Sequence, residues 1–198
     1  MTDYGYVHRL KAGAPGNPIF FVFHGTGGDE RQFFEFGANL LPDATIVSPR
    51  GDVSEHGAAR FFRRTGEGVY DMADLARATD KMATFVGTLA REHQASQVIG
   101  LGFSNGANIL ANLLIERNLF DKAILLHPLI PFKPKDNALE GRQILITAGQ
   151  RDPICPAPLT QALADYFTAQ KAAVDVEWHT GGHDIRQNEI EAVQRFLG

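Results

Sequence analysis

Short apolar runs alternate with longer segments of helical periodicity along the whole chain, and this alternation limits the folds open to it. The apolar runs show little alternation of polar and apolar residues, which is typical of strands covered by helices on both faces. We expect strands at about 4–10, 18–24, 44–49, 97–103, 122–127, 142–148 and 174–179, and helices at about 29–40, 71–93, 105–117, 156–171 and 185–197. The pattern predicts a three-layer α/β fold with a mostly parallel sheet of about seven strands.

Composition adds limits on the class of protein. No repeat or linker interrupts the pattern, so we expect residues 1–198 to form a single domain. A net charge of −4 gives no electrostatic basis for binding nucleic acid, and no apolar run approaches the roughly 18 residues of a membrane span. The first residues lack the apolar core of a signal peptide, and Cys155 is the only cysteine, which excludes an internal disulfide. These features are compatible with a cytoplasmic location.

Functional groups in such a sheet collect on the loops that follow the carboxyl ends of the strands. Three of these loops carry a serine, an aspartate and a histidine, in the chain order Ser104, Asp152, His183. We therefore expect these three side chains to meet at one edge of the sheet.

The stretch GLGFSNGAN, residues 100–108, contains a G-x-S-x-G nucleophile elbow centred on Ser104. Such a strand-to-helix turn is so tight that the central residue adopts a strained backbone conformation, and side chains on the flanking Gly102 and Gly106 would collide with neighbouring elements. The Ser104 hydroxyl then stands clear of the fold at a helix N-terminus, where backbone N–H groups can stabilise an oxyanion.

Free serine is a poor nucleophile near neutral pH, so it needs a base and a group that orients the base. His183 follows a glycine pair between the last strand and the last helix, and it is the strongest candidate base. Asp152, in the loop GQRDPICP, can accept the second ring N–H of His183 and stabilise the imidazolium.

Alternative interpretations exist for this set. His127 ends another strand and is the main alternative base, whereas His179 is expected to lie within a strand. Asp152 could instead cap a helix, and Asp184 is expected to cap the final helix. Cys155 is most simply a small buried residue near the Asp152 loop.

The glycine-rich loop HGTGGDE, residues 24–30, leaves another strand and lets backbone approach a substrate oxygen closely. We assign the oxyanion hole to the backbone amides of Thr26 and Asn105, the latter following the nucleophile. A phosphate-binding loop is the alternative, but neither glycine-rich stretch matches G-x-G-x-x-G or the P-loop pattern.

The segment 50–70 has no clear periodicity and is long for a loop inside a compact domain, which favours a functional role. Phe61 and Phe62 could line a substrate pocket or, equally well, anchor the loop. Nearby arginines are interpreted first as a solvated basic stretch and second as a site for an anionic group; they are Arg60, Arg63 and Arg64. No insertion is long enough for a large lid.

The segments FHGTGGDE, GFSNGAN, AGQRDPICP and GGHD occur in this order and, with the strand pattern, cover nearly the whole chain. The sequence thereby resembles small carboxylesterases and phospholipases of the α/β-hydrolase fold, which are related to acyl-protein thioesterases and dienelactone hydrolases. The resemblance implies ester hydrolysis through an acyl-enzyme, without cofactor or metal, by a triad of Ser104, Asp152 and His183. Thioesterases usually carry glutamine where Asn105 stands, and this departure favours a bacterial esterase branch.

These observations predict a serine carboxylesterase with an open, modest pocket for small soluble esters. The alternatives are a thioesterase or dienelactone-type hydrolase with the same triad, or a non-catalytic homologue that binds a ligand in the same cleft. Homodimer formation is left open.

Overall fold

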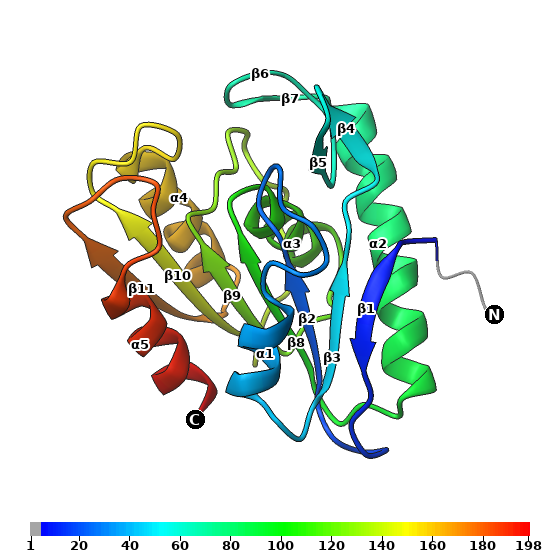
Figure 1. Cartoon of the computed structure of the whole chain (residues 1–198). Coiled ribbons are helices and arrows are strands. Elements are labelled where there is room, and N and C mark those ends of the chain that lie inside the picture. The colour runs from blue at the N-terminus through cyan, green and yellow to red at the C-terminus, as the bar shows by residue number, and fades with distance from the viewer. Residues whose placement is uncertain (1–4) are drawn as a thin grey trace.

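The computed structural model describes residues 5–198, in which one central sheet is enclosed between two layers of helices (Figure 1). The sheet has seven strands in the order β1-β3-β2-β8-β9-β10-β11. These strands are β1 (His8–Lys11), β2 (Ile19–Phe23), β3 (Thr45–Pro49), β8 (Val98–Phe103), β9 (Lys122–Leu126), β10 (Gln143–Gly149) and β11 (Ala173–His179). Of the seven strands of this sheet in residues 5–198, only β1 runs antiparallel to its neighbour, so the mostly parallel sheet is confirmed. Residue 4, which belongs to the first expected strand, lies outside the described residues.

The helices of residues 5–198 divide between the two faces of the sheet, as Figure 1 shows. Buried side chains of α2, α3 and α4 pack on one face, and those of α1 and α5 pack on the other. The helices are α1 (Phe34–Leu40), α2 (Met72–Glu92), α3 (Asn105–Glu116), α4 (Ala157–Ala169) and α5 (Gln187–Leu197). Helix α1 begins at Phe34, whereas the sequence predicted a start at about residue 29. None of these helices has the length and apolar character needed to cross a membrane.

Strand β2 explains why the apolar runs lack polar alternation. Its sequence IFFVF is fully buried at every position. Phe21 and Phe23 belong to the core under α2, α3 and α4, whereas Phe20 and Val22 belong to the core under α1 and α5. Successive residues of a strand point to opposite faces, so a strand covered on both faces is apolar throughout.

The segment expected to be an irregular loop forms two short hairpins. Strand β4 (Val53–Glu55) pairs with β5 (Ala58–Arg60), and β6 (Arg64–Gly66) pairs with β7 (Val69–Tyr70). The hairpins extend beyond the carboxyl ends of the sheet strands, at the top of Figure 1. They therefore border the edge at which the candidate site lies.

Candidate active site

The elbow brings three backbone segments into close contact. A Cβ atom on Gly102 would overlap the carbonyl of Gly106, and a Cβ atom on Gly106 would overlap the carbonyl of Phe23. Ser104 adopts φ 51° and ψ −116°, a conformation that is rare for a residue with a side chain. The Ser104 N–H donates to the Leu126 carbonyl at 2.9 Å, which ties the strained turn to β9. The geometry predicted from G-x-S-x-G is therefore present.

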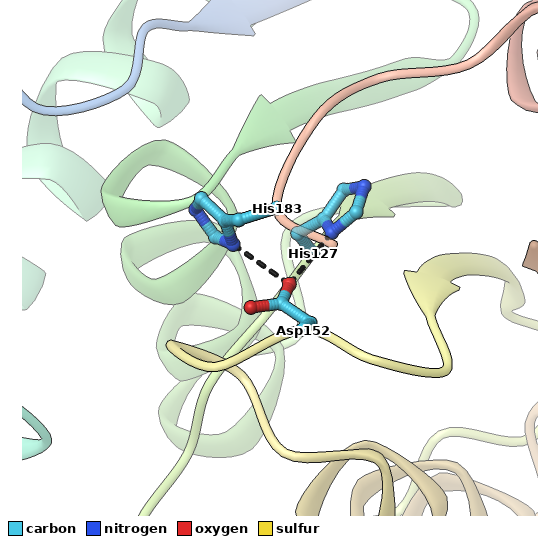
Figure 2. A group of neighbouring side chains, drawn as sticks. All are labelled: His127, Asp152 and His183. Atoms are coloured by element: carbon cyan, nitrogen blue, oxygen red, sulfur yellow. Dashed lines mark hydrogen bonds and ion pairs between the residues drawn. The ribbon is translucent and has the colours of Figure 1, made fainter. Parts of the chain in front are cut away.

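The loops after β8, β10 and β11 bring Ser104, Asp152 and His183 together. His183 Nε2 lies 2.9 Å from the Ser104 Oγ, and His183 Nδ1 lies 2.7 Å from Asp152 Oδ2. Figure 2 shows the second of these contacts. The imidazole thus lies between the hydroxyl and the carboxylate, which is the arrangement in which a histidine can take the serine proton while its tautomer is fixed.

The Asp152 carboxylate is fully enclosed and surrounded by donors. Its Oδ1 accepts the backbone N–H groups of Ile154 at 2.8 Å and Cys155 at 2.9 Å, and its Oδ2 accepts from His183. Burial would raise the pKa of Asp152, but the N–H groups and the ring contacts outweigh burial and hold the pKa below its usual value. The group is therefore ionised at neutral pH and can stabilise an imidazolium on His183.

His127, the alternative base, contacts the same carboxylate rather than the serine. Its Nδ1 lies 2.9 Å from Asp152 Oδ2, and its side chain is completely buried (Figure 2). The candidate for the histidine that deprotonates Ser104 is thus His183. A second histidine on the carboxylate was missed by the sequence analysis, although the position of His127 at the end of a strand, at the same sheet edge, was a usable signal.

A cavity of about 260 Å³ opens beside Ser104. Thr26 and Asn105, the residues assigned to the oxyanion hole from the sequence, both line it. Asn105 is the first residue of α3, where backbone N–H groups have no partner inside the helix. Its side-chain Oδ1 accepts the backbone N–H of Phe61 at 2.8 Å, which ties the start of α3 to the segment that follows β5.

Phe61 and Phe62 do not line the cavity, so their assignment to substrate binding is wrong. Both rings are fully buried in the core beneath the hairpins. Phe61 packs edge-on against Phe23, with ring centroids 5.7 Å apart, and Phe62 packs edge-on against Tyr70 at 4.8 Å. They anchor the segment, because burying a large ring stabilises the fold more than leaving it in an open pocket. The aromatic rings of the cavity wall are those of Tyr70 and Phe103.

The arginines of this segment are not a uniformly solvated stretch. The Arg60 side chain is only 3% exposed, and its Nε lies 3.2 Å from Glu55 Oε2. Arg64 Nε lies 3.0 Å from the other oxygen of Glu55, and both arginines line the cavity. Arg60 Nη1 also donates to Thr26 Oγ1 at 2.6 Å. Arg63 alone fits the solvated interpretation, with 67% of its side chain exposed.

Three further expectations concern residues near the site. His179 lies in β11 as expected, and Cys155 is buried, with burial raising the pKa of its thiol. Asp184 does not cap the last helix, because Arg186 occupies the N-cap position of α5 and Asp184 pairs with it at 2.6 Å.

Within residues 5–198, two groups of side chains have spacings that could suit a metal ion, and both include His127. One group contains Asp152 and His183, which are already hydrogen-bonded to each other. In the other, His179 Nδ1 accepts the Gly181 N–H at 2.9 Å, so a neutral His179 carries its proton on Nε2, the atom that faces Glu189. A protonated nitrogen offers no lone pair to a metal. These residues therefore fit proton sharing better than metal binding.

Comparisons with known proteins give the family and the fold of the chain. Residues 57–190 match the model of the dienelactone hydrolase family. MhqD of Bacillus subtilis, which is named as a hydrolase, is 36% identical over 193 residues, with 96% of each chain covered.

Two solved structures share the fold over nearly their full length. Atu2452 of Agrobacterium tumefaciens, a protein of unknown function, is 63% identical with a TM-score of 0.97, and covers 100% of this chain and 98% of its own. A Bacillus cereus carboxylesterase is 31% identical with a TM-score of 0.91, and the match covers 97% of this chain and 93% of that chain. The α/β-hydrolase fold is thereby confirmed, and the chain is a hydrolase that belongs to the dienelactone hydrolase family.

Proposed function

We propose that this hydrolase is a serine carboxylesterase that cleaves small carboxylic esters through an acyl-enzyme on Ser104. The observation that carries the proposal is the continuous contact from Ser104 Oγ through the His183 ring to the buried Asp152 carboxylate, at 2.9 and 2.7 Å, beside a cavity. Nucleophile, base and orienting group are the three parts that covalent ester hydrolysis requires.

In the proposed mechanism, His183 takes the hydroxyl proton as Ser104 Oγ attacks the ester carbonyl carbon. The Thr26 and Asn105 amides stabilise the negative charge on the carbonyl oxygen. His183 then donates the proton to the departing alcohol oxygen as the carbon–oxygen bond breaks. Water attacks the acyl-enzyme by the same route and gives a proton to His183. His183 then returns this proton to Ser104 Oγ as the acyl–oxygen bond breaks and the carboxylic acid leaves.

The cavity supports substrates of modest size. Its volume of about 260 Å³ is small for a ligand site, and its apolar wall includes Tyr70, Leu129 and Ile154. The match to the dienelactone hydrolase family favours one second candidate, a small lactone, which the same groups would open without releasing a separate alcohol.

Kinetics on a small substrate panel tests the proposal. We expect p-nitrophenyl acetate to be hydrolysed and Ser104→Ala to lose at least about 10³-fold in kcat/KM while unfolding like the parent, because removing one hydroxyl from a side chain that borders the cavity costs little stability. A short-chain lactone and a matched thioester in the same panel separate the candidate substrate classes. Hydrolysis by Ser104→Ala at the parental rate would contradict the proposal.

A further inference from the structure

The Asp152 carboxylate contacts two histidines, His183 beside the serine and His127 in the interior. His127 Nδ1 lies 2.9 Å from the same Oδ2 atom that His183 contacts, and the two rings lie 5.1 Å apart (Figure 2). The other ring nitrogen of His127, Nε2, lies 3.0 Å from Glu189 Oε1. A chain of polar groups therefore runs from Ser104 past Asp152 into the protein interior. The proposed ester hydrolysis involves the groups as far as Asp152 and assigns no role to His127 or Glu189.

Glu189 is a completely buried carboxylate in the first turn of α5. The Thr147 hydroxyl donates to its Oε1 at 2.5 Å, and the Arg186 backbone N–H donates to its Oε2 at 2.6 Å. Burial would raise the pKa of Glu189, but its contacts with His127, Thr147 and Arg186 outweigh burial and lower the pKa. The carboxylate is thus ionised and needs a positive partner.

The His127 ring lies between two ionised carboxylates, one at each nitrogen. A neutral imidazole has only one N–H, whereas an imidazolium has two. Burial alone would lower the pKa of His127, but Glu189 and Asp152 outweigh it and raise the pKa. The Nε2 contact with Glu189 is close without being aligned as a hydrogen bond, so its attraction is mainly one of charge. The other titratable groups around the ring are His183, His179 and the Cys155 thiol, which contacts the His127 carbonyl.

The backbone of His127 is strained as well. Among the described non-glycine residues, five have positive φ, and His56, Gln94 and Lys171 are exposed. The two that are not exposed are Ser104 at φ 51° and His127 at φ 52°. Such a conformation is unfavourable for a residue with a side chain and persists only where surrounding contacts enforce it. The fold therefore holds this histidine in place, as it does the candidate nucleophile.

We propose that His127 is a positioning residue, held as a cation by Glu189, that fixes the Asp152 carboxylate for His183 and balances the second buried negative charge. The inference rests on the proposed serine-esterase function for its effect on turnover. Without His127, the two buried carboxylates would have no buried positive partner between them, and a proton would bind in this region more readily. Protonation there removes either the acceptor for His183 or the free base itself.

The charge of His127 can be measured without any assay of activity. In protein labelled with ¹⁵N-histidine, the His127 ring signals are assigned by their loss in His127→Gln. At pH 8, where an ordinary histidine is neutral, we expect both nitrogens of His127 to carry protons, and Glu189→Gln to convert the ring to a neutral form. A single protonated nitrogen in the parent protein would overturn the proposal.

Kinetics in three variants tests the positioning role. In His127→Gln we expect the acidic limb of the kcat/KM profile to move up by about one pH unit, with the change in kcat rather than KM. The double variant His127→Gln/Glu189→Gln removes one charge of each sign, so its acidic limb should return close to that of the parent, as should that of Glu189→Gln alone. Additive losses in the double variant would indicate a packing role and overturn the proposal.

The two proposals fail in different ways. If the parent protein shows no Ser104-dependent hydrolysis, the proposed function fails, and the NMR measurement still decides the charge of His127. If hydrolysis depends on Ser104 but the pH profile of His127→Gln matches that of the parent, the positioning role alone is wrong.

Discussion

The elbow around Ser104 and the hairpin segment 53–70 border the same cavity, but different forces hold them. At the elbow, backbone packs directly on backbone, because Gly102 and Gly106 leave no room for a side chain. In the hairpin segment, Phe61 and Phe62 are anchored in the core, but the charged side chains of the cavity wall are held by ion pairs. These pairs join Arg60 and Arg64 to Glu55, and Arg64 also to Glu67.

This difference separates two kinds of sensitivity. Backbone packing cannot adjust to an added atom without moving a strand or a helix, so the proposed reacting groups are held rigidly. Ion pairs that are partly exposed contribute little each and rearrange at small cost. We use "elbow edge" for the sheet edge that carries Ser104, His127, Asp152 and His183. We therefore expect substitutions at the elbow edge to affect the chemistry and the fold, and substitutions in the hairpins to affect substrate preference.

The comparison is tested most strongly by removing one polar cavity residue that contacts Ser104 and one that belongs to the hairpins. His183→Gln should lower kcat/KM by about 10⁴-fold or more, because the proposed base is lost. Arg64→Gln, which also lines the cavity, should lower it less than tenfold. Steady-state kinetics on p-nitrophenyl acetate measures both. A loss in Arg64→Gln equal to that in His183→Gln would show that the hairpin takes part in the chemistry.

A pair of glycine substitutions compares the two regions in stability. Gly102→Ala should reduce the free energy of unfolding by about 3 kcal/mol, because the added Cβ meets the Gly106 backbone. Gly57→Ala, at φ 88° in the first hairpin turn with open space around it, should cost only about 1 kcal/mol of backbone strain. Urea denaturation gives both values. Equal costs would mean that the elbow adjusts as easily as an exposed turn.

Arg60 connects the two regions, since it donates to Thr26 and pairs with Glu55. Arg60→Met should lower kcat/KM by about tenfold, because losing a charged hydrogen bond of about 1.5 kcal/mol loosens the proposed oxyanion loop. The matched control is Arg63→Met, whose side chain is 67% exposed and which should stay within about twofold of the parent. If Arg60→Met also stayed within twofold, the hairpin would not support that loop.

Acid should lower the free energy of unfolding, because it protonates the buried carboxylates of Asp152 and Glu189. The pKa values of Asp152 and Glu189 are lowered on folding, so their ionised forms stabilise the protein above about pH 4, and this contribution is lost as pH falls through the lowered values. The pKa of His127 is raised, so its contribution is full below pH 6.5 and is lost as pH rises through the raised value. The contribution of Asp152, Glu189 and His127 to the free energy of unfolding should therefore be greatest between about pH 4 and pH 6.5.

Urea denaturation between pH 7 and pH 3.5 measures the acid effect. Glu189→Gln should lose less stability over this range than the parent, by about 1 kcal/mol or less. Glu67→Gln, at a side chain that is 57% exposed on the hairpin, should follow the parent curve. A Glu189→Gln curve parallel to that of the parent would contradict the ionised state assigned to Glu189.

The elbow and the sheet were predictable because their signals are local. A buried parallel strand is apolar at every position, and G-x-S-x-G specifies a tight turn through the glycines themselves. The loops of Asp152 and His183 follow strands whose carboxyl ends share one edge, so topology alone placed them near Ser104. The distances that now join the three side chains agree with that expectation.

The hairpins and the buried half of the polar chain were not predictable in the same way. Phe61 packs against Phe23 of the central sheet and Phe62 against Tyr70 of β7, so their burial is a matter of tertiary packing. The role of His127 depends on Glu189, which lies 62 residues later in the sequence and is indistinguishable there from a solvated helix residue. Long-range contacts of this kind leave no periodic signal in the sequence.

The central claim is that Ser104 is a nucleophile activated by His183, and covalent trapping tests it most directly. After treatment with a fluorophosphonate, intact-mass and peptide-mapping mass spectrometry should find one adduct per chain on Ser104, no adduct in Ser104→Ala, and greatly slowed labelling in His183→Gln. Stoichiometric labelling that persists in Ser104→Ala, or that maps to Cys155, would contradict the account.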